Sequence, residues 1–123
     1  MIFFTKNVVG LPNSYQCEIK STSFVNNKGI INLSSNNPKI NLYVGKKFSI
    51  DRITGKLFEN ELNVIGEPQV LDVGDKDSSF KVIWIKDGKG VIVQYLNVQE
   101  YSNSPQKPFS YLGGSLLIGG LCE

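Results

Sequence analysis

The sequence predicts an all-β fold: a small closed or nearly closed antiparallel β-barrel of about eight strands, lipocalin-like in outline, with a β-sandwich as the alternative. Apolar and polar residues alternate in runs of roughly five to nine residues, and clusters of Gly, Asn, Asp and Pro separate these runs. Helical spacing is nearly absent. With 123 residues, the chain can bury one hydrophobic core, so we expect a single domain over residues 1–123 with 1–14 as a lead-in segment.

Five strands are expected in the N-terminal half, at residues 15–20, 30–33, 40–44, 47–52 and 56–65. In the first of them Tyr15, Cys17 and Ile19 alternate with polar residues, which is typical of a strand with one buried face. Asn26-Asn27-Lys28-Gly29 predicts a turn, because Asn and Gly tolerate positive φ. Thr54-Gly55 predicts the turn that leads into 56–65.

The C-terminal half is expected to contain a short strand at 69–73, a central strand at 80–85, and further strands at 91–101, 109–112 and 115–122. Residues 80–85 are apolar on both faces apart from Lys81, as expected for a strand inside a sheet. Asp87-Gly88-Lys89-Gly90 is the strongest hairpin signal in the chain. Only residues 5–11 are compatible with a helical turn, which Pro12 would end.

Two cysteines, Cys17 and Cys122, lie near opposite ends of the chain and 105 positions apart. One possibility is a disulfide, which would imply export to an oxidising compartment. The other is a pair of free, buried thiols in a cytosolic protein. A disulfide would favour the barrel, because it would join the first strand to the last, and these are neighbours when an up-and-down sheet closes.

The charges of the chain give no reason to expect a particular class of partner. A net charge of +2, spread along the chain, gives no argument for a nucleic-acid or membrane partner. No apolar run approaches the roughly 20 residues that span a bilayer, so no membrane span is expected. The start, Met1-Ile2-Phe3-Phe4-Thr5-Lys6, lacks the regions of a signal peptide.

No catalytic residue, cofactor or metal site is predicted, and we do not expect an enzyme. The chain has no histidine, which removes Ser-His-Asp and Cys-His mechanisms. Glu59 and Glu61 would share a strand face as paired carboxylates, but that alternation is also typical of any solvent-facing strand. Three carboxylates in 72–78 lack the spacing of a calcium-binding EF-hand loop, so a solvated loop is the better interpretation.

Aromatic residues on the predicted strands are the candidate ligand-binding residues: Phe48, Phe58, Phe80, Trp84 and Tyr95. They could line a cavity for a small apolar ligand, or simply fill the interior of a small barrel. The leading hypothesis is a non-catalytic protein that binds such a ligand or an envelope protein. The alternative is a protein-interaction or inhibitor module that acts through loops such as 74–78 and 102–108.

Several short segments together resemble a group of small exported proteobacterial proteins. They are Tyr15-Gln16-Cys17, Phe48-Ser49-Ile50-Asp51-Arg52-Ile53-Thr54-Gly55, Val70-Leu71-Asp72-Val73-Gly74, Ser79-Phe80-Lys81-Val82, Lys107-Pro108-Phe109 and Cys122. The resemblance covers residues 15–122. It implies a periplasmic or secreted location and a disulfide that frames the domain, and it transfers no catalytic residue. The sequence departs from that group in showing no export signal.

Overall fold

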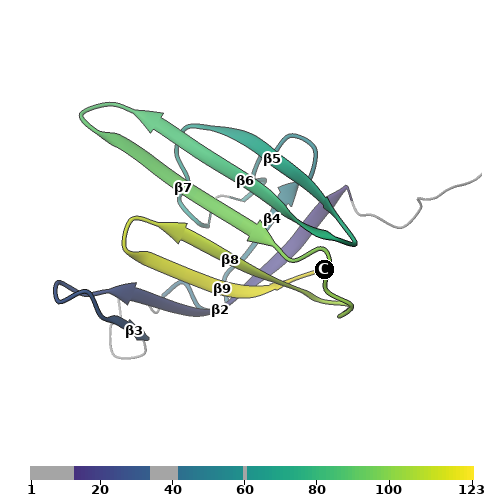
Figure 1. Cartoon of the computed structure of the whole chain (residues 1–123), viewed down its shortest axis with the longest axis horizontal. Coiled ribbons are helices and arrows are strands. Elements are labelled where there is room, and N and C mark those ends of the chain that lie inside the picture. The colour runs from purple at the N-terminus through teal and green to yellow at the C-terminus, as the bar shows by residue number, and fades with distance from the viewer. Residues whose placement is uncertain (1–12, 34–41, 60) are drawn as a thin grey trace, which may run out of the picture.

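A computed structural model describes residues 13–33, 42–59 and 61–123, and these residues form one antiparallel sheet of eight strands with no helix (Figure 1). The strands are β2 (Ser14–Val25), β3 (Ile31–Leu33), β4 (Lys47–Asp51), β5 (Glu67–Asp75), β6 (Ser78–Asp87), β7 (Val91–Val98), β8 (Lys107–Gly113) and β9 (Leu116–Cys122). Their order across the sheet is β3-β2-β9-β8-β7-β6-β5, and β4 pairs with β2 beside β3.

Most of the predicted elements are present. The first strand extends to Val25, and the turn after it is held by the Asn26 side chain, whose Oδ1 accepts the amides of Lys28 and Ile30. β6 lies between β5 and β7, as its two apolar faces predict, and the Asp87–Gly90 segment joins it to β7. The last hairpin turns at Gly114, where φ is +61°.

Two of the predicted strands are wrong. Residues 42–45 form a turn, and the rest of the predicted strand 40–44 lies outside the described residues. Residues 56–59 and 61–65 hold a single isolated bridge, Ile50 to Leu57, instead of a strand. The side chain of Gln94 explains part of this difference: its Oε1 accepts the amide of Ile65 and its Nε2 donates to the carbonyl of Asn63, so these backbone groups are satisfied without a neighbouring strand.

Backbone pairing does not close the sheet, so the predicted closed barrel is not confirmed. β2 and β9 do pair, as expected of the first and last strands, but β4 and β5 remain on separate edges of the sheet. A side chain spans the gap instead. Arg52, directly after β4, donates from Nε to the carbonyl of Val73 at 2.6 Å and from Nη2 to the carbonyl of Gly74.

The turn after β4 also packs closely over β5 and β6. Gly55 has φ +77°, and a Cβ at this position would lie 2.8 Å from a methyl carbon of Val82. Only glycine fits both the conformation and the space. The Thr54-Gly55 turn therefore packs the chain after β4, at one edge of the sheet, against β5 and β6 at the other edge.

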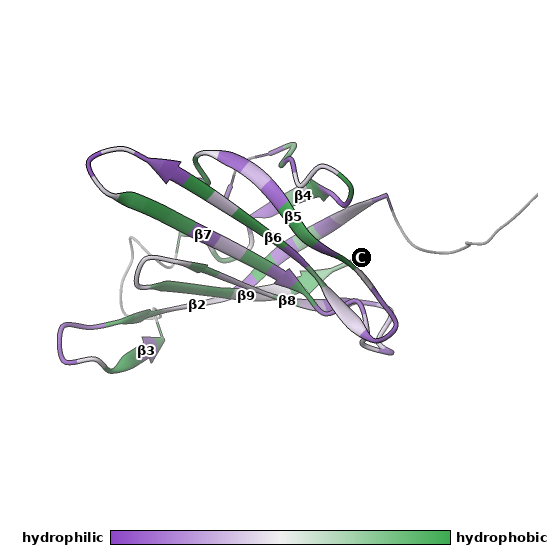
Figure 2. Cartoon of the chain, turned by 45° about the horizontal axis from the view of Figure 1, so that its top comes forward, coloured by the Kyte–Doolittle hydropathy of each residue, from purple (hydrophilic) through white to green (hydrophobic). Residues whose placement is uncertain are grey.

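One face of the curled sheet forms the hydrophobic core. Alternate residues of each long strand point inward, including Tyr15, Cys17 and Ile19 of β2 and Phe80, Val82 and Trp84 of β6. The opposite face is partly polar. In Figure 2 the first half of β7 is strongly hydrophobic, and more polar residues follow along the strand.

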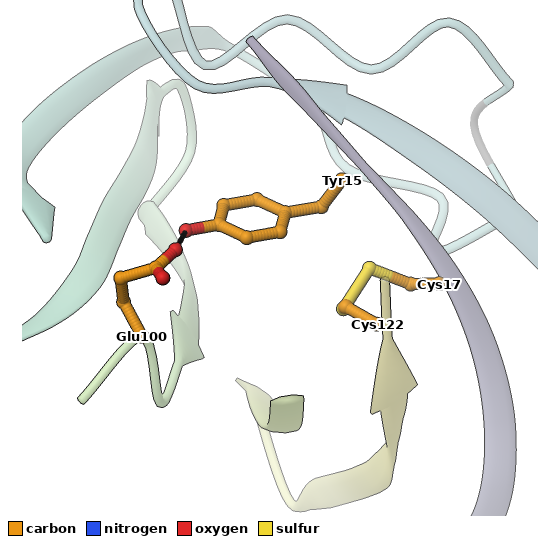
Figure 3. Close-up of a disulfide and its surroundings, with 4 residues drawn as sticks. All are labelled: Tyr15, Cys17, Glu100 and Cys122. Carbon is orange, nitrogen blue, oxygen red and sulfur yellow. Dashed lines mark hydrogen bonds between the residues drawn. A yellow bond between two sulfur atoms is a disulfide. The ribbon is translucent and has the colours of Figure 1, made fainter. Parts of the chain in front are cut away.

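The two cysteines form a disulfide between facing residues of β2 and β9. Gln16 and Glu123 beside them exchange both backbone hydrogen bonds, so Cys17 and Cys122 occupy the close, non-hydrogen-bonded position of an antiparallel pair. Their Cα atoms are 4.0 Å apart, and both residues are buried. Figure 3 shows the bond reaching across from the start of β2 to the end of β9.

Removing the disulfide with Cys17→Ala/Cys122→Ala should lower the free energy of unfolding by about 2–5 kcal/mol, because the bond closes a loop of roughly 100 residues in the unfolded chain. Urea denaturation of the oxidised wild type, the reduced wild type and the double variant measures the effect. The reduced wild type serves as the control and should match the variant. A loss below about 1 kcal/mol would show that β2 and β9 need no covalent link.

Replacing the buried cation with Arg52→Met should cost about 3–5 kcal/mol, because the carboxylate of Glu100, a buried residue whose Oε1 lies 3.8 Å from Nη1 of Arg52, would lose its charged partner. Arg52→Lys should recover little of this, since one ammonium cannot reproduce the planar set of donors. The combined Arg52→Met/Glu100→Gln variant should lose less than the sum of the two single changes. Additive losses in urea denaturation would rule out a coupled pair.

Candidate binding surface

The structure separates the five aromatic residues that the sequence suggests for ligand binding. Phe48, Phe80 and Trp84 are buried in the core. Phe58 is 65% exposed and lies outside the strands. Tyr95 alternates with the buried Gln94 and Leu96 along β7, so it lies on the opposite, outer face of the sheet. The five side chains therefore do not line one common cavity.

The buried aromatic rings pack against one another. Phe48 meets Phe109 edge to face, with ring centroids 5.3 Å apart, and Tyr15 lies 5.4 Å from Phe80 in a tilted arrangement. Both geometries are favourable for aromatic pairs. These contacts favour the interpretation that the aromatic side chains fill the interior.

The carboxylates that the sequence pairs do not share a strand face. Glu59 and Glu61 fall in the irregular segment after β4, and Glu61 forms an ion pair with Lys46 at 3.2 Å. In the Asp72–Ser78 region, the Asp75 carboxylate accepts a hydrogen bond from the amide of Asp77, and the Asp72 carboxylate accepts one from the amide of Gly74. These two carboxylates therefore stabilise the turn. In the part of the chain that the structure describes, no three acidic or cysteine side chains gather as a metal site.

A hollow of about 320 Å³ opens beside the disulfide. Its lining is mostly polar and includes Gln16, Glu18, Lys47, Glu59 and Glu123. Cys17 contributes to its wall, but both cysteines are consumed by the disulfide, so no thiol is available there as a nucleophile. This hollow offers hydrogen-bonding groups and carboxylates.

A buried polar cluster lies at the same end of the molecule and was not foreseen from the sequence. The hydroxyl of Tyr15 donates to Oε1 of Glu100, and the Arg52 guanidinium lies 3.8 Å from the same oxygen. Arg52 and Glu100 are only 3% and 8% exposed. Figure 3 shows Tyr15 pointing from β2 across the interior toward Glu100. Because these buried groups are paired with one another, we assign this cluster to stability.

Gln94 is a further buried polar residue with a structural role. Besides holding residues 63 and 65, its Nε2 donates to the hydroxyl of Tyr111 at 2.8 Å. A signal for it does exist in the sequence, since Gln94 interrupts the row of apolar residues that Leu96 and Val98 continue on the core face.

The most unusual surface is the end of the β6–β7 hairpin, residues 85–93, which we name the β6–β7 tip. Every residue in it is exposed. Four of them are branched aliphatic residues: Ile85 (48%), Val91 (62%), Ile92 (47%) and Val93 (47%). Tyr95 and Leu112 continue the apolar surface across β7 and β8, where a shallow hollow lies beside them.

The β6–β7 tip is exposed because its neighbours end early. β5 reaches only to the pair Glu67–Ile85, and β8 reaches only to the pair Gln94–Gly113. Beyond these points β6 and β7 pair with each other alone, through Lys86–Ile92 and Asp87–Val91. The tip therefore projects as a two-stranded ribbon with apolar side chains on both faces.

Alkaline pH should weaken the fold partly through Tyr15. Burial and the hydrogen bond to Glu100 raise the pKa of Tyr15 above its ordinary value of 10. The folded state thus holds the phenolic proton more tightly than the unfolded state, so this stabilising contribution is complete below pH 10 and is lost as pH rises further. The free energy of unfolding should fall more steeply above pH 10 in the wild type than in Tyr15→Phe. Tyr101→Phe, at an exposed position, should keep the wild-type slope, and equal slopes in all three proteins would contradict this origin.

Comparison with known proteins adds no information on function, so a proposal depends on the geometry described above. No protein-family model, curated protein or solved structure matches the chain. Over residues 13–33, 42–59 and 61–123, no helix has the length and apolar character to cross a bilayer. The disulfide is compatible with an oxidising, extracytoplasmic location.

Proposed function

We propose that this chain is a non-catalytic binding module of the periplasm or the extracellular space, and that it engages its partner through the β6–β7 tip. The observation that carries the proposal is the exposure of four branched aliphatic residues on a ribbon that projects beyond the core. Exposed apolar residues scattered singly are normal, whereas a contiguous group marks an interaction site. On the tip, Ile85 faces Val93 across the ribbon, and Val91 and Ile92 adjoin them.

The interior supports a ligand site less well than the surface does. Phe48, Phe80 and Trp84 are packed in the core. Other side chains, including neighbouring aromatic rings, occupy the space that the predicted cavity would need. A small apolar ligand would have to displace these contacts, which close packing makes unfavourable. The outer surface needs no such rearrangement.

In the loops that the sequence suggests for protein interaction, several polar groups bond to one another within the loop. In 74–78, the Asp75 carboxylate accepts the amide of Asp77 and the hydroxyl of Ser78. In 102–108, Lys107 donates its ammonium group to the carbonyl of Ser102. These polar groups are already paired, so the loops offer a partner less than the β6–β7 tip does.

Two lines support the location. The disulfide between β2 and β9 would persist in an oxidising compartment, and cytosolic proteins rarely keep such a bond. The resemblance to small exported proteobacterial proteins points the same way and likewise supplies no catalytic residue. The absence of histidine adds the chemical reason to favour binding over catalysis.

The test variant is Val91→Thr/Ile92→Thr/Val93→Thr. It replaces three exposed apolar side chains of the tip with polar side chains that are also β-branched. Because these residues are exposed, the free energy of unfolding should change by less than about 1 kcal/mol. A photo-crosslinking residue at position 92 should capture a partner from an envelope or culture-fluid extract of the source organism. The same residue at position 53, which is also exposed but lies at the other end, should not.

Loss of the crosslink in a variant carrying Val91→Thr/Val93→Thr beside the probe would support the proposal. Ile53→Thr/Val73→Thr is the matched control, since both residues are exposed and lie away from the tip. Crosslinking that is equal at positions 92 and 53 would overturn it. So would native mass spectrometry that shows one small molecule bound in both the wild type and the tip variant.

A further inference from the structure

We propose that the β6–β7 tip docks on an anionic phospholipid surface, with the turn between β2 and β3 as a second contact. This inference rests on the proposed function and names the partner of that surface. The net charge of the chain gives no argument for a membrane partner. The argument comes from where the structure places particular apolar and basic residues.

The first step is that the tip is apolar on both of its faces. Ile85, Val91 and Val93 lie on the outer face with Tyr95, whereas Ile92 lies on the core-facing side beyond the end of the core. A second protein copy laid against the outer face would leave Ile92 in water. A lipid surface surrounds a projecting ribbon and removes both faces from water together.

The second step is the reach of the tip. On the β8 side, Val91, Ile92 and Val93 lie beyond the last pair, Gln94–Gly113. Three residues at about 3.3 Å each give a projection of about 10 Å. Apolar side chains at a membrane interface enter about 5–10 Å into the boundary between headgroups and acyl chains. The ribbon can therefore place its aliphatic residues at that depth while the neighbouring strands stay outside.

The third step is the charge. Lys86 and Lys89 lie on the tip with one carboxylate, Asp87, and Glu67 lies at its base opposite Ile85. Lysine ammonium groups beside inserted aliphatic residues suit a surface of anionic headgroups. Each lysine near such a surface changes the partition constant by about fivefold.

A second turn carries the same combination at the same end of the molecule. Lys28 lies in the turn after β2, and Val25, Ile30 and Ile31 beside it are exposed. The pairs Phe24–Leu116, Gly113–Leu116 and Gln94–Gly113 bring this end of β2 to the same end of the sheet as the β6–β7 tip. Figure 1 shows both turns pointing to one end of the long axis.

The experiment is flotation of the intact, disulfide-bonded protein with vesicles of phosphatidylcholine alone, or with about one third phosphatidylglycerol, in 0.1 M NaCl. The wild type should partition into the anionic vesicles at least tenfold more than into the neutral ones. Lys86→Gln/Lys89→Gln should lower the anionic partition by about 25-fold. Val91→Thr/Ile92→Thr/Val93→Thr should lower it at least tenfold, because the inserted methyl groups supply the apolar contact.

Two matched controls lie at the opposite end of the sheet: Lys76→Gln for the charge and Ile53→Thr/Val73→Thr for the apolar residues. Both should float as the wild type does. Equal flotation of the tip variants and these controls, or no flotation of the wild type with anionic vesicles, would overturn the lipid proposal. If the wild type instead forms a dimer in light scattering that the Thr variant loses, the occupant is a second copy. In that case the lipid proposal fails while the proposed function stands.

Discussion

The fold depends on Arg52, because this side chain connects two sheet edges that backbone hydrogen bonds leave apart. Its guanidinium donates to the carbonyls of Val73 and Gly74 on β5 and lies against the Glu100 carboxylate. A lysine could not replace it, since only a planar group with several donors can reach two adjacent carbonyls and a carboxylate together. Unpaired edges invite association with other chains, so a clamp across them also hinders pairing with another chain.

The clamp and the disulfide act at the same end of the molecule, and this gives the fold its asymmetry. Cys17 and Cys122 link the first and last strands where β2 begins and β9 ends, and Arg52 reaches β5 where that strand ends. Polar and covalent links thus hold one end closed. At the other end the β6–β7 and β2–β3 hairpins project, and the core does not cover the β6–β7 tip. The end that the disulfide and Arg52 hold together can position the projecting apolar end against a partner surface.

Local patterns in the sequence predicted most of the strands, but they did not predict which distant segments lie beside one another in the fold. Period-two alternation predicted β2, the run that is apolar on both faces predicted β6, and the Asp-Gly turn predicted the β6–β7 hairpin, because each signal depends on residues close in sequence. The segment 56–65 alternates equally well, yet residues 56–59 and 61–65 form no strand. Two backbone groups in it, the amide of Ile65 and the carbonyl of Asn63, bond to the Gln94 side chain instead of a neighbouring strand. The reach of Arg52 to β5 likewise depends on how the sheet curls, which no local pattern records.

The exposure of the β6–β7 tip, which we propose as the binding surface, could not be predicted from local patterns either. Val91, Ile92 and Val93 look like any buried strand, and they are exposed only because β5 and β8 end before them. Burying a whole aliphatic side chain gains about 1.5–3 kcal/mol, so four side chains that are already half-buried would gain roughly 3–6 kcal/mol together. That range corresponds to a dissociation constant between about 6 mM and about 40 μM. Apolar contact at one tip therefore gives only transient attachment, and useful affinity requires the lysines and the second turn to act with it.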